Sequence, residues 1–341
     1  MIIVVKKGTP KSKIEEFSAF LETMGVRVDT LEGMNQVVIG LVGDTTGIDA
    51  EALRSNQLVE KIIRVQEPYK LVNRLFHPED SCITVVDPAG AEHNIGGGFL
   101  GIIAGPCSVE SREQMVGIAA EVKSAGAGFL RGGAYKPRTS PYSFQGLGSE
   151  GLVMLLEAKR ETNLPIVTEV LDVNQLEVFG DVDIIQVGAR NMQNFTLLKE
   201  LGHIKTPILL KRGYSSTITE LLMAAEHIMT GGNSRIILCE RGIRSFDNYT
   251  RYTLDLSAVP ALKKLSHLPV IVDPSHSTGL SWMVPAMAKA SIAAGADGII
   301  MEVHNNPEKA LCDGEQSLTP KAFASLMADL KKYAGLEGKK I

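Results

Sequence analysis

Apolar residues in the first 65 positions form short strand-like runs and one longer helical pattern. The run "IIVVK" has the length of a buried strand, and "KSKIEEFSAFLETMG" carries its apolar residues at helical spacing before a glycine. The stretches "VRVDTLEG" and "QVVIGLVG" then surround turn residues at 33–35, which predicts a pair of strands. A short helix at 50–53 and the strand "VEKIIRV" complete a β-α-β-β-α-β order. This order predicts a ferredoxin-like domain over residues 1–66.

The segment that follows has no clear periodicity. Residues 67–80 belong to the stretch "QEPYKLVNRLFHPED", which is polar and bracketed by prolines, as is typical of a linker. The next stretch, "SCITVVDPAGAEHNIGGG" at 81–98, has two short extended segments around the turn "DPAG" and predicts a β-hairpin. We therefore expect a main domain over residues 81–341 that begins with this hairpin.

From residue 99 onward, apolar runs of strand length alternate with helical segments. The runs are "LGIIAGPCS", "GFLRGGA", "PIVTEV", "DIIQVGAR", "PILLKRG", "RIILCERG", "PVIVDPSH" and "GIIMEVH". Helical segments such as "REQMVGIAAEVKSAG" lie between them, so we expect buried parallel strands joined by helical crossovers. Eight such units over about 240 residues predict an α/β fold of the (β/α)8 TIM-barrel type. A doubly wound sheet is the alternative, but it would more often carry a glycine-rich fingerprint after its first strand, and none is present.

Composition restricts the binding partners. The chain has 341 residues and a net charge of −4, and it has no long block of Lys or Arg, which disfavours nucleic acids and anionic membranes as partners. Its most apolar windows are far shorter than the roughly 20 residues that cross a bilayer. The first residues, "MIIVVKKG", lack the order of a secretory signal, and the cysteines are not clustered. We therefore expect a cytoplasmic protein with reduced thiols.

Charged residues follow the predicted barrel strands, at the ends where TIM barrels place their catalytic groups. The strand ends carry Cys107, Arg131, Glu169, Arg190, Lys211, Glu240, Arg241, His276 and Glu302. The loop "RGGAYKPRTSPYSFQGLG" adds Lys136 and Arg138 and contains no carboxylate. Any one of these cations could simply form a surface ion pair. Six of them at one barrel mouth, however, predict a site for more than one anionic group, because Arg and Lys bind phosphate and carboxylate oxygens.

A second set of residues has the chemistry of a metal site. It consists of Cys107, His276, Glu302 and, in the loop "ALCDGEQSL", Asp313. A thiolate, an imidazole and two carboxylates suit one divalent ion such as Mn, Zn, Fe or Co. Their spacing forms no local motif, and taken singly Cys107 could be a buried small residue and His276 an ordinary hydrogen-bond donor. Their expected common position at the barrel mouth favours the metal site.

Several segments resemble one known enzyme family. They are "AGPCSVES", "LRGGAYKPRTSPYSFQGLG", "VGARNMQNF", "LLKRG", "CERGIR", "VDPSHSTG" and "MEVHNNPEKALCDGEQSL". Over its whole length the chain is similar to the type I 3-deoxy-D-arabino-heptulosonate 7-phosphate (DAHP) synthases, in particular to the subfamily with a short barrel and an N-terminal ferredoxin-like regulatory domain. The resemblance implies a transferase that condenses phosphoenolpyruvate with erythrose 4-phosphate. That reaction is the first step of the shikimate pathway of aromatic amino acid biosynthesis.

The resemblance also implies individual roles. The implied metal ligands are Cys107, His276, Glu302 and Asp313. The implied phosphoenolpyruvate contacts are Arg131, Lys136, Glu169, Arg190, Lys211 and Arg241. Erythrose 4-phosphate would be held by Arg138 and Thr139. Lys136, Cys107 and His276 would be the catalytic residues, with Lys136 placed to protonate or hydrogen-bond the aldehyde oxygen.

For the N-terminal domain, the resemblance implies feedback regulation. An aromatic end product, tyrosine or phenylalanine, would bind between such domains of neighbouring subunits and would close them over the barrel mouths. The resemblance implies that these subunits form a homo-oligomer, a tetramer. The linker would then serve as the hinge. The simpler alternative is that residues 1–66 only promote dimerisation or solubility.

Two other functions are compatible with the sequence. One is the related 3-deoxy-manno-octulosonate 8-phosphate synthase, which usually carries "KANRTS" where this chain has "KPRTS" and which lacks the N-terminal domain. The other is a sensor that binds a sugar phosphate or an amino acid without catalysis. The complete set of metal-type ligands and cations argues against a sensor.

Overall fold

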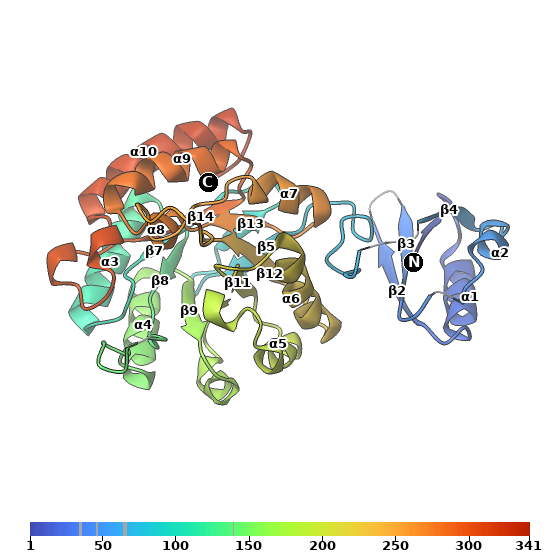
Figure 1. The fold of residues 1–341 in the computed structure, drawn as a ribbon, viewed down its shortest axis with the longest axis horizontal. Helices are drawn as coiled ribbons and strands as arrows, with labels where there is room; N and C mark the ends of the chain where they lie inside the picture. The colour runs from blue at the N-terminus through green and yellow to red at the C-terminus, as the bar shows by residue number, and fades with distance from the viewer. Residues whose placement is uncertain (34–35, 46, 64–66, 139) are drawn as a thin grey trace. The chain divides into compact units, whose positions relative to one another are not determined.

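The computed structural model describes residues 1–33, 36–45, 47–63, 67–138 and 140–341. Within these ranges the chain forms two compact units (Figure 1). The first contains Met1–Asp80 and Lys264–His267, and the second contains Ser81–Lys263 and Leu268–Ile341. Part of the predicted turn at 33–35 and the end of the predicted strand at 59–65 lie outside the described residues.

The first unit is built on a four-stranded antiparallel sheet with the order β2-β3-β1-β4. Its elements are β1 (Ile2–Val5), α1 (Lys11–Glu22), β2 (Arg27–Glu32), β3 (Val37–Val42), α2 (Ala50–Arg54) and β4 (Val59–Ile63). In α1 the buried residues are Ile14, Phe17 and Leu21, which share one face of the helix. They pack in one apolar core with sheet residues such as Ile3 and Ile39. The predicted ferredoxin-like fold is therefore confirmed.

Residues 67–80, for which we predicted a linker, belong to the same compact unit as the sheet. They form turns and bury Tyr69, Val72 and Phe76. The Phe76 ring leaves no room for a side chain on β3, because a Cβ atom at Gly40 would lie 2.1 Å from its Cε2 atom. The polar residues and prolines that indicated a linker thus flank apolar residues that pack against the unit.

The second unit begins with the predicted hairpin. It consists of β5 (Cys82–Val86) and β6 (Glu92–Gly96), which pair antiparallel. Ile83, Val85 and Ile95 belong to the apolar cluster that fills the barrel interior. Arg235, immediately before its barrel strand, donates a hydrogen bond to the Thr84 carbonyl at 2.5 Å. The hairpin therefore packs at the amino end of the barrel and leaves the carboxyl end open.

The main body is a closed barrel of eight parallel strands in which the chain order is also the spatial order (Figure 1). The strands are β7 (Gly101–Gly105), β8 (Phe129–Arg131), β9 (Ile166–Val170), β10 (Ile184–Val187), β11 (Ile208–Lys211), β12 (Ile236–Glu240), β13 (Val270–Val272) and β14 (Gly298–Glu302). The helices are α3 (Arg112–Ala125), α4 (Ser149–Thr162), α5 (Phe195–Gly202), α6 (Ile218–Thr230), α7 (Ala258–Leu265), α8 (Pro274–Thr278), α9 (Val284–Ala293) and α10 (Pro320–Leu336). The predicted TIM barrel is confirmed.

Local sequence explains where these elements start and stop. The barrel strands are buried on both faces, so they appear in the sequence as continuous apolar runs. The Ser111 side chain caps α3 by accepting from the Gln114 amide, and Gly126 ends that helix with a φ of 104°. Thr217 and Glu220 form a capping box at the start of α6. Among the described residues, no helix is both long and apolar enough to cross a membrane.

Candidate active site at the carboxyl end of the barrel

The predicted site residues lie where the barrel strands end. Arg131 is the last residue of β8, Lys211 of β11 and Glu302 of β14. A cavity of about 320 Å³ opens at this end of the barrel. The predicted residues that line it are Lys136, Arg138, Glu169, Arg190, Lys211, Arg241, His276 and Asp313. Its size and polar walls suit small polar ligands.

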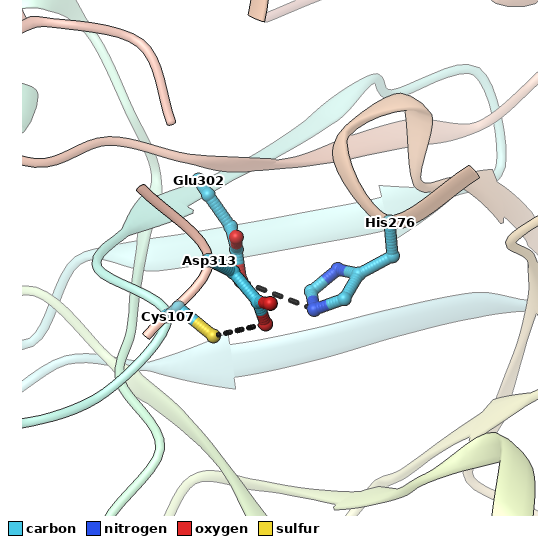
Figure 2. A group of neighbouring side chains, drawn as sticks. All are labelled: Cys107, His276, Glu302 and Asp313. Atoms are coloured by element: carbon cyan, nitrogen blue, oxygen red, sulfur yellow. Dashed lines mark hydrogen bonds and ion pairs between the residues drawn. The ribbon is translucent and has the colours of Figure 1, made fainter. Parts of the chain in front are cut away.

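The four candidate metal ligands converge beside this cavity. Figure 2 shows Cys107, His276, Glu302 and Asp313 pointing toward one another, and their ligand-type atoms all lie within 4.8 Å of one another. The Cys107 Sγ atom is 3.0 Å from Asp313 Oδ2, and His276 Nε2 is 3.1 Å from Glu302 Oε1. Soft sulfur, imidazole nitrogen and carboxylate oxygen form a donor set that fits a borderline divalent ion.

The position of His276 is set by its neighbour Asp273. The strand β13 ends at Val272, and Asp273 then caps the short helix α8, which carries His276. One carboxylate oxygen of Asp273 accepts from the His276 amide at 2.9 Å, and the other lies 2.7 Å from Nδ1. Because Nδ1 is held in this way, Nε2 faces the cluster.

Asp313 reaches the cluster through an unusual backbone conformation. Its φ is 52°, in the left-handed region, which Asp tolerates better than most residues with side chains. The following Gly314 has no space for a side chain, since a Cβ atom there would lie 2.1 Å from the Pro307 carbonyl oxygen. The tight turn brings Asp313 to within hydrogen-bonding distance of Cys107, which is 206 positions earlier in the chain.

The electrostatics of the cluster favour positive charge between its carboxylates. Burial works against charge on His276, but Asp273 and Glu302 outweigh it and raise the pKa of His276 to about 9. Burial alone would raise the pKa of Glu302, but the charges of His276 and Arg131 hold it well below its ordinary value. Burial raises the pKa of the Cys107 thiol well above its ordinary value, while Lys136 opposes the shift. A divalent cation would supply charge of the sign that these carboxylates stabilise.

Two of the six predicted cations have carboxylate partners within the chain. Arg131 Nη1 lies 2.7 Å from Glu302 Oε1, and Lys211 Nζ lies 2.5 Å from Asp273 Oδ2. The positive charge at the barrel mouth is therefore balanced in part by the chain's own carboxylates. Sequence inspection missed the pairs because Arg131 and Glu302 are 171 positions apart and meet only through barrel closure.

Arg241 shows that part of the positive charge has no internal partner. Among the described residues, one buried side-chain nitrogen or oxygen atom makes no hydrogen bond, and it is Arg241 Nη1. Its guanidinium lies 4.3 Å from the centre of the Tyr252 ring, and Nη2 donates to the His276 carbonyl at 3.3 Å. A buried donor without a partner costs about 1–3 kcal/mol, and more when the group is charged. Since Arg241 lines the cavity, its guanidinium is a candidate group for binding an anion there.

Some residues differ from the sequence-based expectations. Glu240 is buried and pairs with Arg212 at 2.8 Å, so it supports the strand end and does not line the cavity. Thr139 lies outside the described residues. Sequence reasoning missed Arg251, which lines the cavity, and Gln316, which donates to Glu302 at 2.6 Å. Arg251 lies in a loop and Gln316 ends the three-residue 3-10 helix η5 (Gly314–Gln316), so neither belongs to a periodic segment that could have indicated it. The spacing of Asp273 before His276 in "DPSH", by contrast, was a usable signal.

Fold and site together define an α/β barrel with a cation-lined cavity and a cluster of metal-type ligands at its carboxyl end. Residues 83–335 match the model of the DAHP synthetase I family, and residues 1–67 match that of the DAHP synthase ferredoxin-like domain. The chain belongs to the DAHP synthetase I family and is an enzyme of the DAHP synthase type.

Individual relatives agree with this assignment. The phospho-2-dehydro-3-deoxyheptonate aldolase of Thermotoga maritima is 48% identical over 342 residues, with 100% of both chains covered. The crystal structure of the Thermotoga maritima enzyme matches with a TM-score of 0.77 over 99% of this chain and 98% of that one. A 2-dehydro-3-deoxyphosphooctonate aldolase of Desulfosudis oleivorans is 34% identical over 260 residues, 70% of this chain and 91% of its own. The resemblance seen in the sequence is confirmed.

Proposed function

We propose that the chain condenses phosphoenolpyruvate with erythrose 4-phosphate to give DAHP and phosphate, and that it needs one divalent metal ion, Mn, Zn, Fe or Co. The main support is the cavity beside the Cys107 cluster, which is lined by cations that include Arg241, whose buried Nη1 atom makes no hydrogen bond. The two substrates together carry two phosphates and one carboxylate, so they match a site rich in Arg and Lys. Family membership supports the same reaction.

We assign different residues of the site to the two substrates. We assign the phosphoenolpyruvate contacts to Arg131, Lys136, Glu169, Arg190, Lys211 and Arg241. We assign erythrose 4-phosphate to Arg138 and Thr139. Arg138 supports this division because it lines the same cavity and its Nη1 atom lies 2.9 Å from Cys312 Sγ, next to Asp313. It would therefore meet the second substrate on the side of the cluster.

Cys107, His276, Glu302 and Asp313 would hold the metal ion. When bound, such an ion polarises an aldehyde oxygen and makes its carbon more electrophilic. Lys136 stands next to this place, with Nζ 2.9 Å from Cys107 Sγ. Burial works against its charge, yet Cys107 and Cys312 raise its pKa above the ordinary value, so Lys136 is protonated at neutral pH. It is therefore placed to donate a proton or a hydrogen bond to the oxygen that gains negative charge.

The remaining cations would stabilise charge later in the reaction. After the carbon–carbon bond forms, water adds at C2 of phosphoenolpyruvate, and the phosphohemiketal loses phosphate. Arg241 and Lys211 line the cavity from neighbouring strands, so both can stay on the phosphate oxygens as their charge increases. Preorganised cations in a site that excludes water stabilise such charge more strongly than they would in bulk solvent.

We further infer the biological setting. The reaction would be the first step of the shikimate pathway and would take place in the cytoplasm. The enzyme would be a homo-oligomer, a tetramer. Tyrosine or phenylalanine would inhibit it by binding to residues 1–66. Two observations support parts of this inference. All four cysteines are free, which suits a reducing compartment. The sheet of the first unit has its own apolar core, as a separate regulatory domain would need.

The sugar phosphate that the enzyme accepts as its second substrate distinguishes this function from the alternatives. We would measure phosphate release from phosphoenolpyruvate in the presence of Mn with erythrose 4-phosphate, with arabinose 5-phosphate, and with no acceptor. We expect release with erythrose 4-phosphate alone. Release with arabinose 5-phosphate in its place would identify an octulosonate 8-phosphate synthase. No release with either acceptor, from protein whose metal content is verified, would favour a sensor.

A further inference from the structure

Two residues that the proposed reaction does not use connect the carboxylates of the cluster. Gln316 Nε2 donates to Glu302 Oε2 at 2.6 Å, and Gln316 Oε1 accepts from Arg251 Nη1 at 3.1 Å. The same Arg251 nitrogen lies 3.3 Å from Asp313 Oδ1. Gln316 is the last residue of the short 3-10 helix η5 (Gly314–Gln316) and is only 2% exposed. One guanidinium and one amide thus join two carboxylates from different segments of the chain.

The contacts separate the inner and outer oxygens of each carboxylate. In Asp313, Oδ2 faces Cys107 and Oδ1 faces Arg251. In Glu302, Oε1 faces His276 and also accepts from Arg131, while Oε2 accepts from Gln316. Arg251 and Gln316 therefore hold the outer oxygens, and the inner oxygens remain directed into the cluster. Asp273 has the same relation to His276, because it holds Nδ1 and leaves Nε2 facing inward.

The hydrogen bonds fix the orientation of the Gln316 side-chain amide. A guanidinium only donates hydrogen bonds, so the Gln316 atom beside Arg251 must be the amide oxygen, and the NH2 group must face Glu302. Arg251 is itself fixed by its backbone, whose amide donates to the Thr278 carbonyl at 3.0 Å. Thr278 is the last residue of α8, the helix that carries His276. The pair thus connects the three segments that supply His276, Glu302 and Asp313.

We propose that Arg251 and Gln316 are a positioning pair that orients both carboxylate ligands of the metal site. This inference rests on the proposed metal dependence and goes beyond it by assigning the cluster its outer support. Partners that hold metal ligands from outside typically contribute about 10–100-fold in metal affinity or activity. Neither residue would touch the ion or the reacting atoms.

The test measures metal binding directly, on the full-length protein. Wild type, Arg251→Gln, Arg251→Lys and Gln316→Met would be stripped of metal and titrated with cobalt against a chromophoric chelator. The Co²⁺ absorption bands would report the thiolate contact and the coordination geometry. Arg244→Gln is the matched control, because Arg244 lies in the same loop after β12 but stacks on Tyr214, with 4.6 Å between guanidinium and ring centre.

We expect the cobalt dissociation constants of Arg251→Gln and Gln316→Met to rise about 10–100-fold, with altered Co²⁺ bands. Arg251→Lys keeps the charge but replaces the planar guanidinium, whose Nη1 atom contacts both acceptors, with an ammonium of different reach and direction, so it should lie between wild type and Arg251→Gln. Arg244→Gln should bind cobalt like wild type. Gln316→Met keeps the side-chain length, and circular dichroism with thermal melting of the stripped proteins would show that each variant is folded.

The outcomes distinguish a failure of the positioning pair from a failure of the proposed metal site. Dissociation constants within twofold of wild type and unchanged bands, for both Arg251→Gln and Gln316→Met, would overturn the positioning pair while leaving the metal site intact. Equal weakening in Arg244→Gln would also overturn it, because the effect would then come from the loop as a whole. A wild-type protein that binds no cobalt would contradict the proposed metal dependence, and the positioning pair with it.

Discussion

The two compact units of this chain use their buried space in opposite ways. The core of the first unit is made of apolar side chains such as Ile3, Leu21 and Ile39. The carboxyl end of the barrel instead buries charged groups, among them Arg131 and Glu302. Burying an apolar side chain stabilises the fold, whereas burying an ionised group destabilises it unless a partner is present. The first unit therefore has the composition of a structural core, and the barrel mouth that of a reaction site.

Two buried histidines show the same contrast at single residues. His276, at the barrel mouth, lies between two carboxylates that raise its pKa to about 9. His267, in the first unit, is buried near Arg74 and stacked on His77 with 4.3 Å between ring centres; burial lowers its pKa to about 4. The barrel mouth thus stabilises positive charge and the first unit excludes it, although both imidazoles are largely shielded from water.

Removing a cluster ligand should have the largest effect. Cys107→Ala or His276→Ala takes away one of four ligands, and a catalytic metal site has none to spare, so turnover should fall below detection. Bound metal, measured by plasma mass spectrometry, should fall with it. Cys239→Ala is the matched control, since Cys239 is a buried cysteine of the barrel core outside the cluster. Full activity after exhaustive chelation, with metal loss verified, would refute the metal requirement.

Acid should weaken the first unit through His267. The folded pKa of about 4 lies below the ordinary 6.5, so the unfolded chain takes up the proton first. Neutral His267 contributes at most about 3 kcal/mol to the free energy of unfolding. This contribution is complete above pH 6.5 and is lost as the pH falls toward 4. Asp80 opposes this shift, while Arg74 and His77 increase it.

The loss would be measured by hydrogen exchange of peptides covering residues 68–80 and 264–268, at pH 7 and pH 5, corrected for intrinsic rates. His267→Gln removes the titrating group and should flatten the pH dependence of these peptides. If wild type and His267→Gln lose protection equally at pH 5, another group is responsible, and the contrast between the two histidines would not reflect their burial.

A third prediction tests which cations of the barrel mouth bind which substrate. Arg138→Ala should weaken erythrose 4-phosphate more than phosphoenolpyruvate, because we assign Arg138 to the aldose alone. Loss of one charge-assisted phosphate contact costs about 1.5–3 kcal/mol, or roughly 10–150-fold in affinity. The KM of each substrate would be measured with the other saturating, so phosphoenolpyruvate serves as the internal control. Equal weakening of both substrates would contradict the division.

Periodicity predicted the fold well because each element follows from its own residues. Buried parallel strands need continuous apolar runs, and β10 and β14 have them. The positions of Cys107 and Glu302 could also be predicted, because a barrel brings all strand ends to one face. What could not be predicted are contacts that depend on closure or on loops. Arg251 contacts Asp313 across 62 positions, and no local pattern indicates that pair.

The segment before the barrel shows another limit of sequence patterns. Residues 67–80 carry polar residues and prolines, but several of their apolar residues are buried in the first unit, where Tyr69 is 1% and Phe76 4% exposed. Turn segments have no period that separates buried from exposed positions. A truncation that ends at residue 66 would therefore leave these apolar side chains without the sheet against which they pack.

The smallest expected effect on turnover comes from removing the N-terminal part of the first unit. Deleting residues 1–80 takes away the sheet together with the turns that pack on it, while every proposed catalytic group stays in the barrel. We expect kcat within about twofold of full length, with inhibition by tyrosine and phenylalanine lost, because an effector regulates only by binding one state more tightly than another. Steady-state assays with each amino acid would test this. Undiminished inhibition of the truncated enzyme would place the effector site in the barrel, and the first unit would then have only a structural role.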